Sequence, residues 1–302
     1  MSTFFKKIKL ELCKLKLANK IITDRSIEIH KKKIDKIEKS FSKKLKFYSP
    51  IDFKHLYKKH YNSCHIWGSG YSADFTKNFI KDRDEFFHIG FGFSCLLEIK
   101  YNFYLIENAS DKNWKLIQSQ NKALKKFLDM NKTVLVFKNL WQKKNDPNVA
   151  YENYKNDAFF IRDLIIPHYN MSDFAINNTI DKLLINDPNY FREACSSVIT
   201  SIIFAKFLGF KEIVLHGIDL SSNYFFDKTY YKENHSDCIP PHIKNIYDKD
   251  WRSNKNKHPT ANCLEVLLPK LRDKLKIDYN IDLLSASKKS GSSKYLNTFF
   301  NN

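Results

Sequence analysis

Short apolar runs alternate along the chain with longer stretches in which apolar residues recur at helical spacing. The apolar runs predict six strands, at residues 65–67, 86–89, 103–106, 133–137, 213–215 and 281–284. The helical patterns predict helices at residues 114–130, 196–208 and 261–275. This alternation is typical of an α/β fold in which a mostly parallel sheet carries helices on both faces. Ligands of such sheets bind where loops leave the carboxyl ends of the strands.

The segment from Ser196 to Asp219 contains the clearest module of a helix followed by a strand. We expect the helix to end at Gly209, because glycine readily adopts the left-handed conformation of a C-cap. A buried strand follows, and Gly217 then turns the chain before Asp219. We interpret the helix and the strand as core. Ser196, Asp219 and Tyr224 lie at or beyond the ends of these elements, where we expect the ligand edge.

Glycine is rare in the chain, with 7 residues in 302. Four of the seven form two close pairs, Gly68/Gly70 and Gly90/Gly92, each behind an apolar run. Amides without a neighbouring Cβ can approach a phosphate, and a helix that begins behind Ser72 would add positive potential. The first loop lacks a Walker pattern and is too short for the dinucleotide fingerprint. Taken alone, a tight turn without a ligand is the better interpretation.

Charge divides the chain into two parts. The formal net charge is +18, and residues 1–60 hold 18 Lys and Arg against 6 Asp and Glu. We therefore expect a basic helical extension at residues 1–60, followed by a larger domain at residues 61–302. The extension has no uninterrupted apolar stretch of the kind that a signal peptide or a membrane span needs. We expect a cytoplasmic protein.

Three interpretations of the basic extension stay open. It is a solvated helical hairpin, or it lies on anionic lipid, where each lysine contributes about 1 kcal/mol, or it binds nucleic acid. The third is the weakest, because the rest of the chain shows no nucleic-acid-binding motif.

Cysteines and acidic pairs indicate no metal site. The 6 cysteines are scattered without a Cys-x-x-Cys pattern, as expected of reduced thiols in the cytoplasm. Asp248-Lys249-Asp250 resembles the metal-binding Asp-x-Asp of many nucleotide-diphosphate-dependent enzymes, but it lies in a polar loop, and we interpret it as solvated charge. That loop, at about residues 221–257, is a candidate lid. Residues 285–293 are rich in Ser and Lys and are expected to be loose.

Five segments share their order and approximate spacing with one enzyme family. They are Gly68-Ser69-Gly70-Tyr71-Ser72, Glu107-Asn108-Ala109-Ser110, Cys195-Ser196-Ser197-Val198, Leu208-Gly209-Phe210-Lys211-Glu212-Ile213 running into Gly217-Ile218-Asp219, and His258 before a helix. Over roughly residues 63–290 the chain thereby resembles glycosyltransferase family 42, the bacterial sialyltransferases that decorate lipooligosaccharide. Residues 1–60 lie outside the resemblance.

The resemblance implies a Rossmann-like catalytic domain with a mobile lid. It implies transfer of sialic acid from CMP-sialic acid to a sugar hydroxyl, with inversion and with no cofactor beyond the donor. His258 would be the general base, a task that suits the usual histidine pKa of about 6.5. The candidate substrate-binding residues are Gly68, Ser69, Gly70, Ser72, Gly90, Asn108, Ser196, Ser197, Asp219 and Tyr224.

Three departures from the family pattern leave the donor open. Ser221 stands where a second lid tyrosine is expected, an expected asparagine near Gly90 is replaced, and Glu193 stands in place of an arginine. Arg192 lies one position away, and it or Lys211 could meet a donor carboxylate or phosphate. Kdo or another nonulosonate carried on CMP is therefore an alternative donor.

Expected partners are the donor, a glycan acceptor, an anionic membrane surface and a second copy of the chain. A basic nucleic-acid-binding or membrane-binding protein without catalysis is the alternative from another class. His216, the rival to His258 as base, is interpreted as a near-core histidine.

Overall fold

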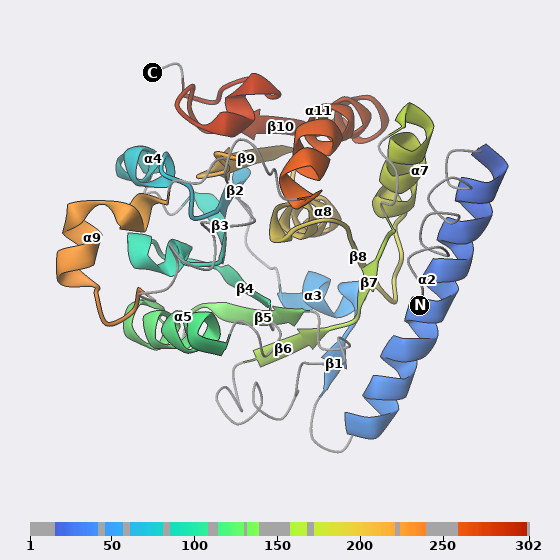
Figure 1. The fold of residues 1–302 in the computed structure, drawn as a ribbon, viewed down its shortest axis with the longest axis horizontal. Helices are drawn as coiled ribbons and strands as arrows, with labels where there is room; N and C mark the ends of the chain where they lie inside the picture. Colours follow the sequence, from blue (N-terminus) through green and yellow to red (C-terminus); the bar gives the residue numbers. More distant parts are fainter. Residues whose placement is uncertain are drawn as a thin grey trace.

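A parallel sheet forms the centre of the molecule (Figure 1). The computed structural model describes residues 16–41, 46–56, 61–80, 85–107, 114–129, 132–138, 158–167, 172–220, 224–239 and 259–300. Within these residues the main sheet has eight strands in the order β1-β6-β5-β4-β3-β2-β9-β10, and every pair in it is parallel. The strands are β1 (Phe47–Tyr48), β2 (Ser63–Trp67), β3 (Phe86–Phe91), β4 (Phe103–Glu107), β5 (Val134–Lys138), β6 (Ala158–Ile161), β9 (Glu212–His216) and β10 (Asp282–Ser285).

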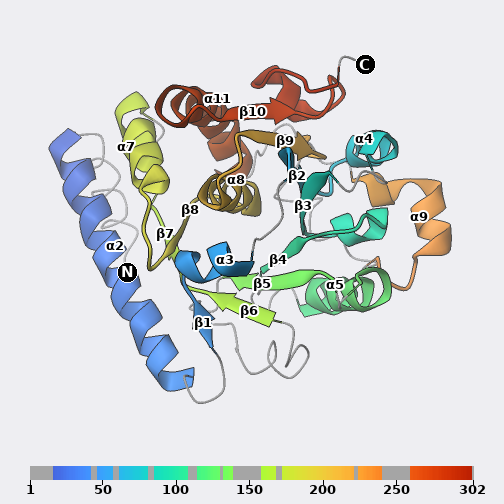
Figure 2. The ribbon, with the colours of Figure 1, turned by 180° about the vertical axis from the view of Figure 1, so that it is seen from behind.

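Helices cover both faces of this sheet, as Figures 1 and 2 show. One face packs against α3 (Pro50–Leu56), α8 (Ser197–Leu208) and α11 (Pro259–Tyr279), with α7 (Asp173–Leu184) beside them. The other face packs against α4 (Ala73–Ile80), α5 (Trp114–Phe127) and α9 (Thr229–Asn234). Successive side chains of β2 alternate between the faces, so that Ile66 joins the first core and Trp67 the second. The predicted α/β fold with helices on both faces is confirmed.

The six predicted strands are present as β2, β3, β4, β5, β9 and β10, and the three predicted helices as α5, α8 and α11. The edge strand β1 and its neighbour β6 were not predicted. They pair through Phe47 with Phe160, so residues 47–48 of the segment expected to precede the main domain extend its sheet. A separate parallel pair joins β7 (Asp163–Ile165) to β8 (Phe191–Glu193).

A helix of 26 residues, α2 (Lys16–Phe41), lies along one side of the molecule next to α7 and β7 (Figures 1 and 2). Its buried Ile27 and Ile34 belong to the core of the α8 face. In the described part of the chain, no helix is both long enough and apolar enough to cross a membrane.

The order of the strands reverses between β2 and β9. From β2 the chain moves to β3, β4 and β5 on one side, whereas β9 and β10 lie on the other side. The carboxyl ends of β2 and β9 are therefore neighbours at the point where open α/β sheets generally bind ligands.

The expectation that residues 285–293 are loose is wrong. Ser285, Ser287, Ser290 and Ser292 are buried, with exposed fractions of 2% or less. The hydroxyls of Ser285 and Ser292 lie 2.8 Å apart, and Ser290 Oγ donates to Ile218 O at 3.2 Å. Buried hydroxyls are tolerated when they are hydrogen-bonded, and here the partners come from the same segment and from the turn after β9.

Candidate functional site

The glycine loop after β2 packs directly against the turn after β9. Gly68 N donates to His216 O at 2.8 Å, and Gly70 N donates to Gly217 O at 2.9 Å. A Cβ on Gly70 would lie 2.6 Å from Gly217 O and 2.7 Å from the Asp219 carboxylate. The close approach of two protein loops thus accounts for both glycines, and their amides already have acceptors. Within the described residues, Ser69 N and Tyr71 N are the amides of this loop without an acceptor.

Asp219 caps the helix that follows the glycine loop. Its Oδ2 accepts from Ser72 N at 2.7 Å, and its Oδ1 accepts from Ser72 Oγ at 2.5 Å. A carboxylate in this position is stabilised by the helix dipole and by amides that would otherwise lack acceptors. Asp219 and Ser72 therefore occupy the N-terminus of α4, where the sequence analysis considered a contact with a phosphate.

The second glycine pair also approaches protein atoms closely. A Cβ on Gly90 would lie 2.5 Å from the Tyr104 ring and 2.7 Å from the Tyr101 ring. Gly92 has φ +68°, and a Cβ there would lie 2.9 Å from Ser69 Oγ. That hydroxyl accepts from Phe93 N at 2.9 Å, so the loops after β2 and β3 are joined.

The first turn of α8 contains a hydroxyl without a partner. Ser196 is the N-cap of this helix, but its side chain makes no capping hydrogen bond. Its Oγ is buried and has no hydrogen-bond partner within the part of the chain that the structure describes. The preceding Cys195 has φ +69°, a left-handed conformation that costs a non-glycine residue roughly 1–2 kcal/mol. An unpaired buried hydroxyl costs a further ~1–3 kcal/mol, and such local strain clusters at functional sites.

A buried cation lies below this turn. The Lys138 side chain, at the carboxyl end of β5, is 3% exposed, and its Nζ lies 2.9 Å from Glu193 Oε2 and 3.8 Å from Glu107 Oε2. Thr200 Oγ1 of α8 donates to the same Glu193 oxygen at 2.9 Å, and Ser197 Oγ donates to Glu107 Oε2 at 3.3 Å. Burial alone would lower the pKa of Lys138, but the carboxylates of Glu193 and Glu107 outweigh it and hold that pKa above its usual value.

The two basic residues proposed from the sequence to meet a donor anion have other partners. Arg192 Nη2 lies 2.8 Å from Asp187 Oδ2, and its Nη1 donates to Lys182 O at the end of α7. Lys211 lies at the amino end of β9 and donates to Tyr279 O. Lys138, which the sequence analysis missed, is a buried cation near the first turn of α8. Its signal was a lysine that ends a strongly apolar strand.

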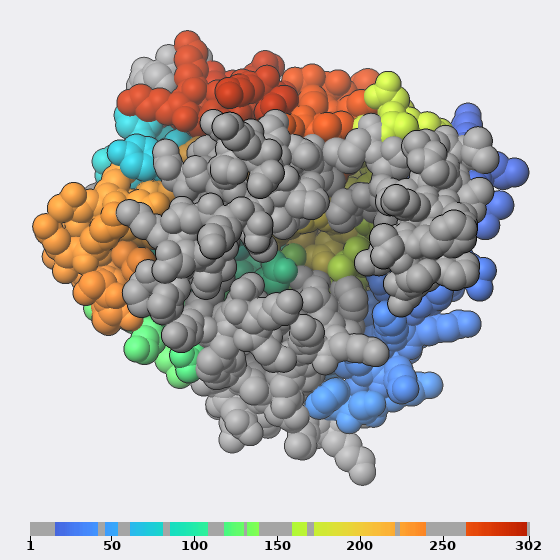
Figure 3. Space-filling view, in the orientation of Figure 1, coloured from blue at the N-terminus to red at the C-terminus, as the bar shows by residue number. Residues whose placement is uncertain are grey.

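Atoms in the colours of β4 and α8 are visible on the face drawn in Figure 3. The elements that carry Glu107 and Ser197 are thus accessible from one side of the molecule. The Glu107 side chain itself is 50% exposed.

The beginning of the predicted lid is next to the glycine loop. Tyr224 forms an antiparallel bridge with Gly70, and its ring stacks on Phe226 with centroids 4.6 Å apart. Tyr224 therefore lies beside the glycine loop.

The described part of the expected lid, residues 224–239, is packed. Tyr231 OH donates to Asp74 Oδ1 of α4 at 2.6 Å, and Lys228 Nζ lies 2.7 Å from Asp74 Oδ2. Burial would raise the pKa of Asp74, but these partners hold it below its usual value. Tyr231 is buried by this anchor, whereas Tyr230 is exposed.

His216 belongs to a buried chain of hydrogen bonds. Thr76 Oγ1 donates to Ala73 O, so it accepts from His216 Nδ1 at 2.9 Å. His216 Nε2 then accepts from His65 Nδ1 at 2.9 Å, and His65 Nε2 accepts from Ser63 Oγ at 2.8 Å. Burial holds the pKa of His216 well below its usual value. The interpretation of His216 as a core residue is confirmed.

Two candidate residues, Asn108 and His258, lie outside the described residues, as does Asp248-Lys249-Asp250. In the part of the chain that the structure covers, no group of three or more His, Cys, Asp or Glu side chains could hold a metal ion.

No protein-family model and no curated protein matches the chain. Among solved structures it is similar to the sialyltransferase CstII from Campylobacter jejuni in complex with cytidine-5'-monophosphate, with 17% identity and a TM-score of 0.43 over 81% of this chain and 87% of that chain. The same enzyme with the substrate analogue CMP-3FNeuAc gives 16% identity and a TM-score of 0.41 over 80% and 87%. An alpha-2,3-sialyltransferase from Campylobacter jejuni in apo form gives 14% and 0.43 over 81% and 82%. At these identities and scores the likeness says nothing about which ligand this chain binds.

Proposed function

We propose that the protein is a glycosyltransferase that moves sialic acid from CMP-sialic acid to a sugar hydroxyl of a surface glycan, with inversion and without a metal. The observation that carries this proposal is the buried, unpaired hydroxyl of Ser196 at the first turn of α8. An oxygen atom of the CMP-sugar bound there would accept a hydrogen bond from the Ser196 hydroxyl and would lie at the positive end of a 12-residue helix.

The chemistry of such a transfer needs few protein groups. The donor already carries a good leaving group, so the enzyme must deprotonate the acceptor, stabilise the departing phosphate and exclude water. In this proposal His258 is the base, and Ser196, Ser197 and the amides that open α8 bind the anionic donor. Lys138 lies below them, where its ammonium neutralises the buried Glu193 carboxylate and so keeps that negative charge from opposing the donor.

The remaining candidates have supporting roles in the proposal. Ser69 N and Asn108 hold the nucleotide, and Tyr224 donates its phenol to the leaving phosphate. Gly68, Gly70 and Asp219 have an indirect role, because their hydrogen bonds hold the loops of the site in position.

Kdo or another nonulosonate on CMP is the second candidate donor. The specific reason is Glu193, which stands where the resemblance implies an arginine and which pairs with Lys138. A site in which the cation comes from β5 instead of β8 presents its charge from a different direction. It could therefore select a donor of different shape.

A ligand panel tests the nucleotide. Thermal unfolding is measured with CMP, UDP, GDP and NAD, and we expect CMP alone to stabilise the protein, by about 2.7 kcal/mol at a concentration one hundred times its Kd. Stabilisation by none of the four would support the non-enzymatic alternative.

A matched pair of serine variants tests the site. Ser196→Ala should raise the melting temperature of the free protein, because it removes an unpaired hydroxyl. It should also weaken the binding of CMP-sialic acid, so that about ten times more ligand or more is needed for the same stabilisation. This corresponds to the loss of a hydrogen bond to a charged group, ~1.5 kcal/mol or more. Ser201→Ala is the control, since Ser201 lies one turn further along α8 and already donates to Ser197 O. Equal effects of the two variants on donor binding would refute the assignment.

His258→Ala tests the base. CMP release from CMP-sialic acid and from CMP-Kdo is followed with a glycan acceptor present, which also separates the two donors. The variant should lose transfer while its CMP-dependent thermal shift persists. Near wild-type turnover would exclude His258 as the base.

A further inference from the structure

One face of α2 holds this helix rigidly to the body of the protein. Ile27 and Ile34 are buried in the main core. Asn178 Nδ2 of α7 donates to Asn19 Oδ1 at 2.9 Å, and His30 Nδ1 lies 3.2 Å from Ile165 O of β7. Because this inner face is fixed by packing, the direction of the outer face is fixed as well.

The outer face of α2 carries an amphipathic stripe. Exposed residues recur every three or four positions along the helix, as one straight row on an α-helix requires. We call this row the α2 stripe; it consists of Leu17, Ile21, Arg25, Glu28, Lys32, Lys36 and Lys39. Exposed Lys20, Ile29 and Lys33 flank it. Leu17, Ile21 and Ile29 are 72%, 57% and 48% exposed, so three aliphatic side chains lie on the solvent side of this helix.

The carboxylates of α2, including Glu28 of the stripe, pair with basic groups outside the stripe. Asp35 and Glu38 both pair with Arg162, which follows β6 in the body. Asp24 pairs with Lys182 of α7, and Glu28 pairs with Lys31 on α2 itself. The acids of α2 thus pair with basic groups outside the stripe, in which four of the seven residues are basic.

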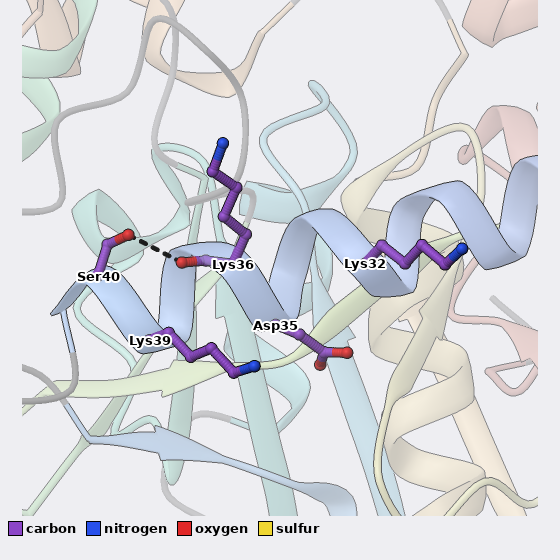
Figure 4. Close-up of a pocket in the computed structure, with 5 residues that line it drawn as sticks. All are labelled: Lys32, Asp35, Lys36, Lys39 and Ser40. Carbon is purple, nitrogen blue, oxygen red and sulfur yellow. Dashed lines mark hydrogen bonds between the residues drawn. The ribbon is translucent and has the colours of Figure 1, made fainter.

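Figure 4 shows the C-terminal end of the stripe, where Lys32, Lys36 and Lys39 line a shallow depression together with Asp35 and Ser40. The three lysine side chains extend from the helix separately. Binding of a helix to an anionic membrane surface depends on inserted apolar area and on electrostatic attraction, and the outer face of α2 offers groups for both.

We propose that the α2 stripe is a docking surface for an anionic lipid bilayer. The cations match the charge of the lipid headgroups, and each is worth about fivefold in affinity near such a surface. Leu17, Ile21 and Ile29 would enter the acyl boundary. Nucleic acid explains these aliphatic residues less well, because single strands are bound by aromatic stacking and duplexes by polar contacts. The proposal goes beyond glycosyl transfer and does not depend on it.

Sedimentation with vesicles tests the proposal on the full chain, without any substrate. Binding is measured to vesicles of phosphatidylcholine alone and to vesicles with about one quarter phosphatidylglycerol, at low and at high salt. The stripe variant replaces four cations with glutamine: Arg25, Lys32, Lys36 and Lys39. The control variant makes the same change in net charge at four exposed lysines elsewhere: Lys122, Lys125, Lys288 and Lys294.

We expect the wild type to bind the anionic vesicles and not the neutral ones. The stripe variant should lose at least one hundredfold in affinity, from about fivefold per cation, and the control much less. A third variant, with serine at Leu17, Ile21 and Ile29, should lose binding while keeping its cations. All variants should keep the wild-type melting temperature and CMP response, since the changed side chains are exposed.

Three outcomes would overturn the docking proposal. Equal losses in the stripe and control variants would show that diffuse charge attracts the lipid, and unchanged binding would place the contact elsewhere; either overturns the proposal. Stripe-dependent binding to RNA without binding to vesicles would also overturn it, in favour of nucleic acid. Absence of any CMP response would refute the proposed enzyme and leave the vesicle result intact.

Discussion

The buried pair of Lys138 and Glu193 allows a prediction whose size follows from the structure. Lys138→Met removes the ammonium that lies 2.9 Å from Glu193 Oε2 and leaves a carboxyl group with an exposed fraction of 6%. Breaking one side of a buried ion pair typically destabilises a protein by about 3–5 kcal/mol. The remaining hydrogen bond from Thr200 Oγ1 stabilises the carboxylate only in part.

Proton uptake limits this penalty. The unpaired carboxyl group in the variant can become neutral, which for an ordinary glutamate with a pKa near 4.3 costs roughly 3.7 kcal/mol at pH 7 and about 1 kcal/mol at pH 5. We therefore expect Lys138→Met to lose about 3–4 kcal/mol of stability at pH 7 and much less at pH 5. Protonation of this carboxyl group in the folded variant removes the buried charge. The stability of the variant therefore rises relative to that of the wild type as the pH falls.

Urea unfolding of four proteins at both pH values measures this effect. They are the wild type, each single variant and the double variant Lys138→Met/Glu193→Gln. The double variant should recover most of the loss at pH 7, because no buried charge remains and the new amide oxygen still accepts from Thr200. A loss below about 1 kcal/mol, a loss that is the same at both pH values, or a double variant no more stable than Lys138→Met would refute the reasoning.

Two further predictions concern the turn after β9. Gly291→Ala should destabilise the protein by ~1–3 kcal/mol and weaken CMP binding, because a Cβ would overlap the Asp219 carbonyl and displace this turn. Gly209→Ala is the control: its φ of +96° makes alanine unfavourable, but no atom lies within 4 Å of the new Cβ, so thermal unfolding should show a loss of stability with an unchanged CMP response. Because the pKa of His216 is well below its usual value, its contribution to stability is present above about pH 6.5 and lost as the pH falls below it. His216→Asn should therefore show a smaller decrease in melting temperature between pH 7.5 and 5.5 than the wild type, and an identical decrease would contradict this.

Local signals in the sequence were sufficient to predict the structure where a single residue type determines the backbone conformation. Gly209 and Gly217 have φ of +96° and +62°, as a C-cap and a turn require, and the helix and strand beside them lie where they were predicted. The short strand β6 and the helix α7 were missed although their signals were present. Ser172 accepts from Ala175 N as an N-cap, a pattern that is readable from Ser172-Asp173.

Tertiary partners explain what the sequence could not reveal. The position of the glycine loop was predicted correctly, but the reason for its glycines was not visible. His216 and Gly217, which accept from the Gly68 and Gly70 amides, are distant in sequence. Lys138 and Glu193 are 55 residues apart, and one sequence does not show that they pair. Residues 285–293 have the composition of a loose loop, but four of their serines are buried, with partners in the same segment and in the turn after β9.

The packing of the glycine loop has a consequence for the order of folding. Its amides bind carbonyls of residues 216 and 217, and that turn is supported in its place by Ser290 and Ser292. As the ribosome releases the chain, β2 to β5 are available early, whereas the acceptors for the glycine loop emerge about 150 residues later and the serines later still. Contacts so distant in sequence form slowly, since a long loop must close first. The ligand edge between β2 and β9 is therefore expected to be the last part of the sheet to become native, after the strands that carry it.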